Sequence, residues 1–404
     1  MRKLFIAAFM FVSAFTTNSF ADGHGIKMGI ILGFTGPIES LTPAMADSAE
    51  LAFKEASDSG SLLGGKYIKA ERADSTCVDS AAATTAAEGL IAGGVVAIMG
   101  ADCSGVTGAI ATNAAVPNGV VMISPSATSP GLTTLADNGY FFRTAPSDAR
   151  GGQVLADITK DRKVKTIAVT HTNNDYGKGL ADVYVAAVKA HGIKVTAVTA
   201  HEEGKADYGA EVATLAAAGG DALAVLGYLD QAGGMIIQGS LDAGSFDTFV
   251  LSDGMIGDSL TDRFGKDLNK SFGSLPGSTG KGAGKFAEVA KAAGIDSSGP
   301  YTGESYDAAA LIALAMQAGG KADRATVQAN VMSVANAPGT KIYPGELKKG
   351  LDLLAKGKQI NYEGATAVEF TDVGEAFGSF LEKEIKGGKS VSYTHLTLPT
   401  KCSV

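Results

Sequence analysis

The sequence lacks the residues and motifs on which many enzymes depend. It contains no tryptophan, five histidines and three cysteines in 404 residues. No G-x-S-x-G or H-E-x-x-H motif is present, no P-loop fits the glycine-rich stretch at 277–285, and no G-x-G-x-x-G opens the helical stretch after Phe34. Hydrolysis of these classes and nucleotide binding therefore have no support, and we expect neither enzyme activity nor a cofactor.

Positive charge is also sparse. Lys and Arg total 34 against 42 Asp and Glu, which gives a net charge of −8, and no basic patch stands out. Binding to nucleic acid is therefore not expected, and the acidity favours solubility. With 404 residues, 45% of them hydrophobic, the chain is long enough for two domains with buried cores. We expect a monomer.

The first 21 residues have the pattern of a signal peptide. Arg2 and Lys3 precede an uncharged apolar run at 4–12, and Ala21 closes a small-x-Ala cleavage site. A transmembrane anchor is the alternative, but the apolar run is short for a bilayer, and no later stretch is long and apolar enough to span one. We therefore expect residues 1–21 to be removed and the protein to be periplasmic.

Cysteine usage fits an exported protein. Cys77 and Cys103 are the natural pair in an oxidising compartment, and their disulfide would contribute about 3.5 kcal/mol by the chain-entropy estimate. Two free buried thiols are the alternative. Neither cysteine has a CxxC partner or a nearby histidine, so we expect no metal site.

The C-terminal stretch differs in style from the rest of the chain. Residues 391–404, which include Cys402, lack the Ala/Gly-rich composition of the rest of the chain, and they show no helical or strand periodicity that we can connect to the fold. We interpret them as a non-native or disordered tail, with a genuine short disordered terminus as the alternative.

Short apolar runs alternate with helical stretches along the chain. Buried strands are expected at 26–34, 67–73, 95–99, 120–123, 166–170, 195–200, 222–228 and 248–251, with a final strand-like pair at 365–370 and 376–383. Continuous apolar strands that alternate with amphipathic helices favour parallel sheets covered on both faces. We predict an α/β fold of two doubly wound, Rossmann-like lobes joined by a hinge that the chain crosses several times.

Two breaks in this rhythm, at 140–148 and 269–284, divide the chain. The first lobe is expected to comprise 25–143 plus 275–360, and the second 146–274 plus 365–388. Such a layout places a cleft between the lobes at the carboxyl ends of the strands, where open α/β sheets bind ligands.

Polar residues follow the carboxyl ends of several expected strands. They are Ser104, Ser126 and Thr128 in the first lobe, and Tyr176, Tyr228 and Asp253 in the second. Because such ends meet at one edge of a sheet, these side chains would face one cleft. Hydroxyl and N–H groups suit a carboxylate and Asp253 suits an ammonium, so the set suits a zwitterion.

Each of these residues also has an ordinary structural explanation. Ser126 and Thr128 are typical of helix caps and turns. Tyr176 and Tyr228 are typical of an amphipathic core, and Asp253 is typical of a side chain that braces a loop. For any single residue the sequence leaves both interpretations open.

Several stretches carry a resemblance to a known family. They are IKMGIILGFTGP, GADCSG, VVMISPSATSP, YFFRTAPSD, HTNNDYGKGLAD, LGYLDQAGGMI, VLSDG and IYPGELKKGLDLLAKGKQINYEGA, with the pair Cys77 and Cys103. Their order and spacing resemble the leucine/isoleucine/valine-binding branch of the type I periplasmic solute-binding proteins of ABC importers, over about residues 26–389.

The resemblance implies a two-lobed protein that closes on an amino acid, branched-chain or related, and docks on a membrane permease. It implies a disulfide between Cys77 and Cys103 beside the site. Its ligand set is Ser104, Ser126 and Thr128 around the α-carboxylate and amine, Asp253 on the amine, and Tyr176 and Tyr228 on the second-lobe wall.

Two departures from the family pattern concern the ligand's side chain. Leu41 stands where some relatives carry an aromatic residue, and Asp253 stands where some carry the longer Glu. The preferred side chain therefore need not be branched and aliphatic. A ligand sensor of the same fold that acts in signalling is the alternative to transport, and an exported α/β enzyme is a third hypothesis without a recognisable catalytic set.

Overall fold

The computed structural model describes residues 25–395 and contains two large, mainly parallel sheets. The first sheet has five parallel strands in the order β2-β1-β3-β4-β5. Their bounds are β1 Ile26–Leu32, β2 Ile68–Asp74, β3 Ala97–Gly100, β4 Val121–Ser124 and β5 Phe141–Arg143. The order reverses between β1 and β3, so a ligand crevice is expected beyond the carboxyl ends of these two strands.

The second sheet repeats this order and adds two antiparallel strands. Its strands run β14-β13-β10-β9-β8-β6-β7, and those from β10 to β7 are parallel. Their bounds are β6 Thr166–Thr172, β7 Lys194–His201, β8 Ala222–Leu226, β9 Phe249–Leu251, β10 Phe272–Pro276, β13 Phe380–Lys386 and β14 Lys389–His395. The order reverses between β6 and β8, which places a second crevice beyond those strands.

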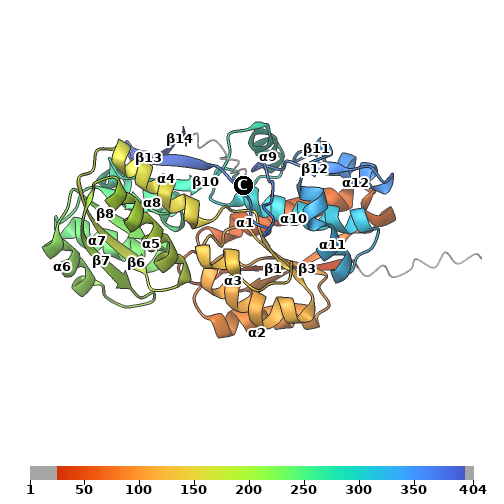
Figure 1. Ribbon diagram of the computed structural model, residues 1–404, viewed down its shortest axis with the longest axis horizontal. Coiled ribbons are helices and arrows are strands. Elements are labelled where there is room, and N and C mark those ends of the chain that lie inside the picture. The colour runs from red at the N-terminus through yellow and green to blue at the C-terminus, as the bar shows by residue number, and fades with distance from the viewer. Residues whose placement is uncertain (1–24, 396–404) are drawn as a thin grey trace, which may run out of the picture.

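Helices cover both faces of each sheet, as the alternating sequence pattern predicts. The first sheet lies between α2 and α3 on one side and α1, α10 and α11 on the other (Figure 1). The twelve α-helices are α1 Thr42–Asp58, α2 Ser80–Ala92, α3 Ser104–Ile110, α4 Asp148–Asp161, α5 Asp175–Ala190, α6 Gly209–Ala218, α7 Gly234–Asp242, α8 Asp258–Phe264, α9 Lys281–Ala292, α10 Thr302–Gly319, α11 Arg324–Ala335 and α12 Leu347–Ala355, within residues 25–395. The predicted α/β class is confirmed. None of these helices is both long and apolar enough to cross a bilayer.

The chain passes between the two sheets three times. It enters the second sheet after Arg143, returns after Pro276 to α9, and enters the second sheet again at Phe380. The two sheets lie in different halves along the long axis, and β13, a strand of the second sheet, runs along the top of the view (Figure 1). A small parallel pair, β11 Thr340–Ile342 and β12 Ile360–Tyr362, lies beside α12. Three crossings between two lobes are typical of a hinge. The last strand before the second crossing, β10, ends at Pro276, two residues beyond the predicted end of the second lobe's first segment at 274.

The sequence predicts that residues 391–404 are a non-native or disordered tail, and the disordered alternative is wrong for residues 391–395. These residues belong to β14, which pairs antiparallel with β13. Lys386 pairs with Lys389, so Gly387 and Gly388 form a two-residue hairpin loop, with φ of 63° and 78°. Glycine adopts such angles without steric cost and is the usual choice in these turns. Residues 396–404 and the predicted signal peptide at 1–21 lie outside the described residues.

The predicted disulfide between Cys77 and Cys103 is confirmed. Its Cα atoms are 5.2 Å apart. Cys77 lies in the loop after β2 and Cys103 immediately precedes α3, so the bond ties together two loops at the carboxyl edge of the first sheet.

Helix α10 is buried over nearly its whole length and carries two carboxyl groups into the core. Burial raises the pKa of Glu304 to about 8 and that of Asp307 to about 6. Asp307 accepts hydrogen bonds from the Tyr362 hydroxyl (2.8 Å), the backbone N–H groups of Ala365 and Thr366 (2.7 and 2.9 Å) and the Thr366 hydroxyl (2.7 Å). These bonds only partly offset the loss of solvation.

We expect the unliganded protein to become less stable as the pH rises from about 5 to about 8. Glu304 keeps its proton in the folded state over this range and loses it in the unfolded state, so the folded state binds more protons and deprotonation favours unfolding. The free energy of unfolding should fall by up to about 1.4 kcal/mol per pH unit for such a group. Urea unfolding at pH 5 and pH 8 measures this, and Glu304→Gln should flatten the dependence. An equally steep slope in that variant would contradict the assignment to Glu304.

Candidate functional site

A small cavity lies where the carboxyl ends of the two sheets face each other. Its volume is about 30 Å³. The residues that line it come from both halves of the chain and are Ile38, Leu41, Met45, Asp102, Cys103, Ser104, Ser126, Tyr176, Tyr228, Asp253, Gly254 and Tyr301. Five of the six residues predicted to bind ligand are among them, and Thr128 is not. The strand order reverses between β1 and β3 in the first sheet and between β6 and β8 in the second. The loops that follow these strands therefore line the cavity.

The first-sheet wall presents hydroxyl groups held by local hydrogen bonds. Ser104 begins α3, and its Oγ accepts the backbone N–H of Ser129 at 3.1 Å. The Ser126 hydroxyl donates to the backbone carbonyl of Asp102 at 3.1 Å. Ser104 and Ser126 therefore have fixed positions before any ligand binds. Thr128 is 1% exposed and lies behind the cavity, where its hydroxyl is next to the Asp148 carboxyl.

Asp102 joins three loops of this wall. Its carboxylate accepts the backbone N–H of Gly33 at 2.6 Å, the Ser75 hydroxyl at 3.0 Å and its neighbour's N–H, that of Cys103, at 2.9 Å. Burial nevertheless raises the pKa of Asp102 above its usual value. The first-sheet loops are thus organised around a buried acid.

The second-sheet wall is aromatic. Tyr176, in the first turn of α5, and Tyr228, which follows β8, have ring centroids 5.2 Å apart with 21° between the ring planes. The Asn174 side-chain amide donates to the Tyr228 hydroxyl oxygen at 3.3 Å. Both rings are almost completely buried, and both line the cavity.

Asp253 is the acid of the second-sheet wall. It follows β9, and its two carboxylate oxygens accept hydrogen bonds from the hydroxyls of Tyr176, at 2.5 Å, and Tyr301. Burial raises the pKa of Asp253 above its usual value, although both tyrosine hydroxyls oppose the shift. The nearby Asp148 also has a pKa well above its usual range, because of burial and of repulsion from Asp253. Such a buried acidic pair favours a positively charged ligand group.

Sequence reasoning did not identify Tyr301 or Asp148 as part of this region. Tyr301 has a left-handed backbone, with φ of 59°, immediately before α10, and reaches Asp253 from the part of the chain that returns to the first sheet. Asp148 begins α4 where the chain has just entered the second sheet. No local pattern points to Tyr301, because it reaches the site only through the return of the chain to the first sheet. Asp148 ends the quoted stretch YFFRTAPSD, which could have drawn attention to it. Asp102 lies in the quoted GADCSG stretch and could have been recognised as a polar residue beyond β3.

An apolar surface completes the cavity. Ile38, Leu41 and Met45 lie on the loop after β1 and the start of α1, and all three are buried. Leu41 occupies this surface, at the position where the family resemblance places an aromatic residue in some relatives. The cavity thus combines serine hydroxyls, an apolar side and a carboxylate with two tyrosines, which is a binding surface without a recognisable nucleophile and base.

Comparison with known proteins gives consistent matches along most of the chain. A family model described as periplasmic binding protein matches residues 25–345. The leucine-, isoleucine-, valine-, threonine- and alanine-binding protein of Pseudomonas aeruginosa is 29% identical over 80% of this chain and 85% of its own. A chemotactic signal transduction system substrate-binding protein of Halobacterium salinarum, BasB, is 28% identical over 90% of this chain and 87% of its own.

Two further matches show how much of a relative's length this chain spans and which known structure has the same fold. Leu/Ile/Val-binding protein homolog 3 of Brucella melitensis is 30% identical over 60% of this chain, and the match spans 64% of that relative. The crystal structure of the leucine-binding protein LivK of Thermotoga maritima covers 91% of this chain and 98% of its own, with a TM-score of 0.75 and 20% identity. At that identity the structural likeness shows a shared fold.

Proposed function

The chain belongs to the periplasmic binding protein family, and from this premise we propose that it is exported, captures an amino acid between its two lobes and delivers it to the permease of an ABC importer. The family consists of binding proteins, so the prediction that this chain is not an enzyme is confirmed. The observation that carries the proposal is the Asp253 carboxyl, which is buried and faces the fixed hydroxyls of Ser104 and Ser126 across one cavity. An amino acid offers an ammonium to Asp253 and a carboxylate to the Ser104 hydroxyl, which accepts the Ser129 N–H and keeps its own hydrogen to donate.

Capture of a ligand requires the lobes to separate. The cavity of about 30 Å³ has room for water molecules and not for an amino acid. Contacts between the halves hold this closed arrangement: Asp230, after β8, accepts the Ser40 backbone N–H at 2.8 Å and its hydroxyl at 2.9 Å. The Asp230 backbone N–H donates to the Pro37 carbonyl at 2.9 Å. A ligand drives closure only by contacts that it makes better in the closed state, and Asp253, Tyr176 and Tyr228 supply those contacts.

A thermal-shift screen over the twenty amino acids tests the proposal. A ligand that binds only the folded state adds RT ln(1 + [L]/Kd) to stability, so at 100 times its Kd it adds about 2.7 kcal/mol and raises the melting temperature by a few degrees. We expect at least one amino acid to do so, with calorimetry giving one site per chain. A flat response to all twenty would overturn amino-acid capture.

Ligand sensing is the second candidate function. The name of the halobacterial relative, a chemotactic signal transduction system substrate-binding protein, supports it. Transport predicts that deletion of the gene abolishes uptake of the labelled ligand, whereas sensing predicts unchanged uptake and a lost behavioural response. Genes for a permease and an ATPase beside this gene would favour transport.

A further inference from the structure

A second, larger cavity lies next to the first one and also lies between the two halves. Its volume is about 310 Å³, and it is lined by Cys77 and Val106 from the first-sheet side and by Asn174, Asp175, Glu202 and Glu203 from the second, among others. Asn174 donates to the hydroxyl of Tyr228, which lines the first cavity. Cys77 is bonded to Cys103, which also lines the first cavity. Two bonded pairs of side chains therefore connect the linings of the two cavities.

Glu203 lines this second cavity, and one of its carboxylate oxygens lacks a regular hydrogen bond. Its side chain is 7% exposed, its Oε2 accepts the backbone N–H of Ala232 at 3.1 Å, and its Oε1 is buried without a hydrogen bond of regular geometry, although the Thr172 hydroxyl lies close enough to the carboxyl to lower its pKa. The nearest basic group is His201 Nε2, 3.8 Å from Oε1, which is too far for a hydrogen bond. Burial lowers the pKa of His201 to about 4, so this ring is neutral at pH 7. A buried carboxyl oxygen without a partner costs free energy unless a ligand satisfies it.

The charges around the two cavities point to a cation. Their linings include Asp102, Asp253, Asp175, Glu202 and Glu203 and contain no Lys, Arg or His. Residues 25–395 contain no cluster of three metal-ligating side chains, so an organic cation fits this cavity better than a metal ion. Burial raises the pKa of Glu203 to about 7, and a bound cation would lower it.

We propose that Glu203 binds a second cationic group of the ligand, an ammonium or a guanidinium, while Asp253 binds the α-ammonium. This inference rests on the proposed function and narrows its ligand to amino acids with a basic side chain. The methylene chain of such a ligand passes between Tyr228 and the disulfide, along the boundary that the two cavities share. It accounts for the carboxyl oxygen Oε1 that lacks a regular hydrogen bond and for the absence of a basic residue in either lining.

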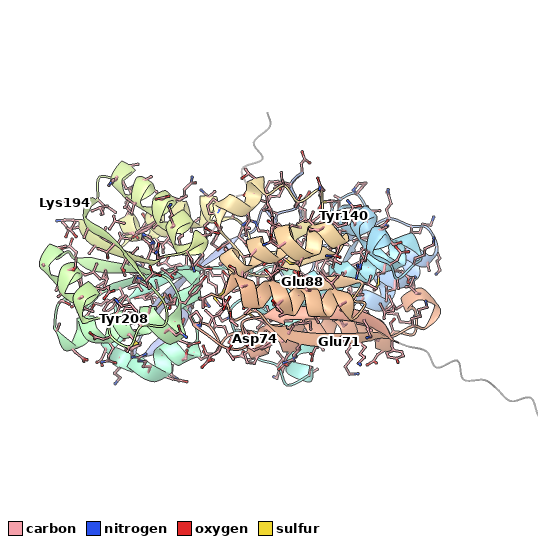
Figure 2. The ribbon with its side chains drawn as sticks, turned by 90° about the horizontal axis from the view of Figure 1, so that it is seen from below. Glu71, Asp74, Glu88, Tyr140, Lys194 and Tyr208 are labelled. Atoms are coloured by element: carbon pink, nitrogen blue, oxygen red, sulfur yellow. A yellow bond between two sulfur atoms is a disulfide. The ribbon has the colours of Figure 1, made fainter. Side chains whose placement is uncertain are left out.

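Lysine and norleucine test this proposal, because they differ only in the terminal ammonium. In calorimetry at pH 8 we expect the wild-type protein to bind L-lysine about 10- to 150-fold more tightly than L-norleucine, the range for a hydrogen bond to a charged group. Glu203→Gln should remove most of this preference and leave the affinity for norleucine unchanged. Glu88→Gln, on the exposed side of α2 in the half opposite to Lys194 and Tyr208 (Figure 2), removes the same charge and should leave the preference intact.

The remaining outcomes separate this inference from the proposed function. Equal binding of lysine and norleucine, or a lysine preference that Glu203→Gln does not reduce, would overturn the role of Glu203 and leave amino-acid capture standing. Tight binding of cadaverine that depends on Glu203, with no amino acid bound, would support the second cation and overturn amino-acid capture. Circular dichroism and thermal melts confirm that each variant is folded before its affinity is compared.

Discussion

Replacing Asp253 with alanine is expected to abolish amino-acid binding while the protein stays folded. The carboxylate is 7% exposed and is the counter-charge that the second-sheet wall offers to an ammonium. Removal of one partner from a buried charge pair costs about 2–5 kcal/mol, which weakens binding about 30-fold to several thousand-fold. Isothermal titration calorimetry with the amino acid selected by the thermal-shift screen measures the loss.

Two further variants separate lost charge from lost structure. Asp253→Ala leaves the hydroxyls of Tyr176 and Tyr301 without their acceptor, so it should also lower stability by about 1–3 kcal/mol. Asp253→Asn keeps the shape and one carbonyl acceptor, and it should lose binding with a smaller change in stability. Asp262→Ala removes an exposed carboxylate from α8 and should change neither. Unchanged affinity in both Asp253 variants would exclude the ammonium role.

The strand-end part of the site could be predicted from the sequence because it follows from local order. Apolar strands that alternate with helices predict parallel sheets, and parallel strands bring their carboxyl ends to one edge. Ser104, Ser126, Tyr176, Tyr228 and Asp253 each follow a strand and line one cavity. Their roles as ligand-binding residues stay a prediction, which the Asp253 variants begin to test.

Residues that act through long-range paths could not be predicted in this way. Tyr301 meets Asp253 only because the chain returns to the first sheet before α10 begins. The stretch 365–370 reads as a strand, yet the structure places only one bridge there, between Phe370 and Ala376. Its backbone N–H groups at 365 and 366 donate to Asp307, and that of Phe370 donates to the Asn336 side chain at 2.8 Å. These backbone N–H groups bond to side chains that are distant in sequence instead of to a neighbouring strand. The alternation of apolar residues within the segment carries no information about such acceptors.

Arg143 is expected to stabilise the crossing between the sheets more than any exposed ion pair does. It ends β5, is 1% exposed, and donates to the carbonyls of Ala127 and Ser129 at 3.1 and 2.8 Å. It also donates to the Thr133 hydroxyl at 2.8 Å and to Glu375 at 2.5 Å. Arg143→Met keeps much of the volume, removes the counter-charge of Glu375 and takes away the guanidinium donor of the Ala127 carbonyl. The Ser129 carbonyl keeps the Leu132 N–H, and Glu375 keeps the Thr133 hydroxyl. We expect the free energy of unfolding to fall by about 3–5 kcal/mol, measured by urea denaturation.

A double variant tests how much of that loss comes from the ion pair between Arg143 and Glu375. In the double variant Arg143→Met/Glu375→Gln a neutral amide replaces the buried carboxylate. The fall in the free energy of unfolding should therefore be smaller than the sum of the falls in the two single variants. Arg150→Met, on the partly exposed side of α4, should stay within about 0.5 kcal/mol of the wild type. Because Arg143 holds the segment 127–129, between Ser126 and the η4 turn Pro130–Thr134, the Arg143 variant should also bind ligand more weakly where it is still folded. Wild-type stability in Arg143→Met would show that the crossing is held by packing alone, and full affinity in a folded but destabilised variant would separate this arginine from the site.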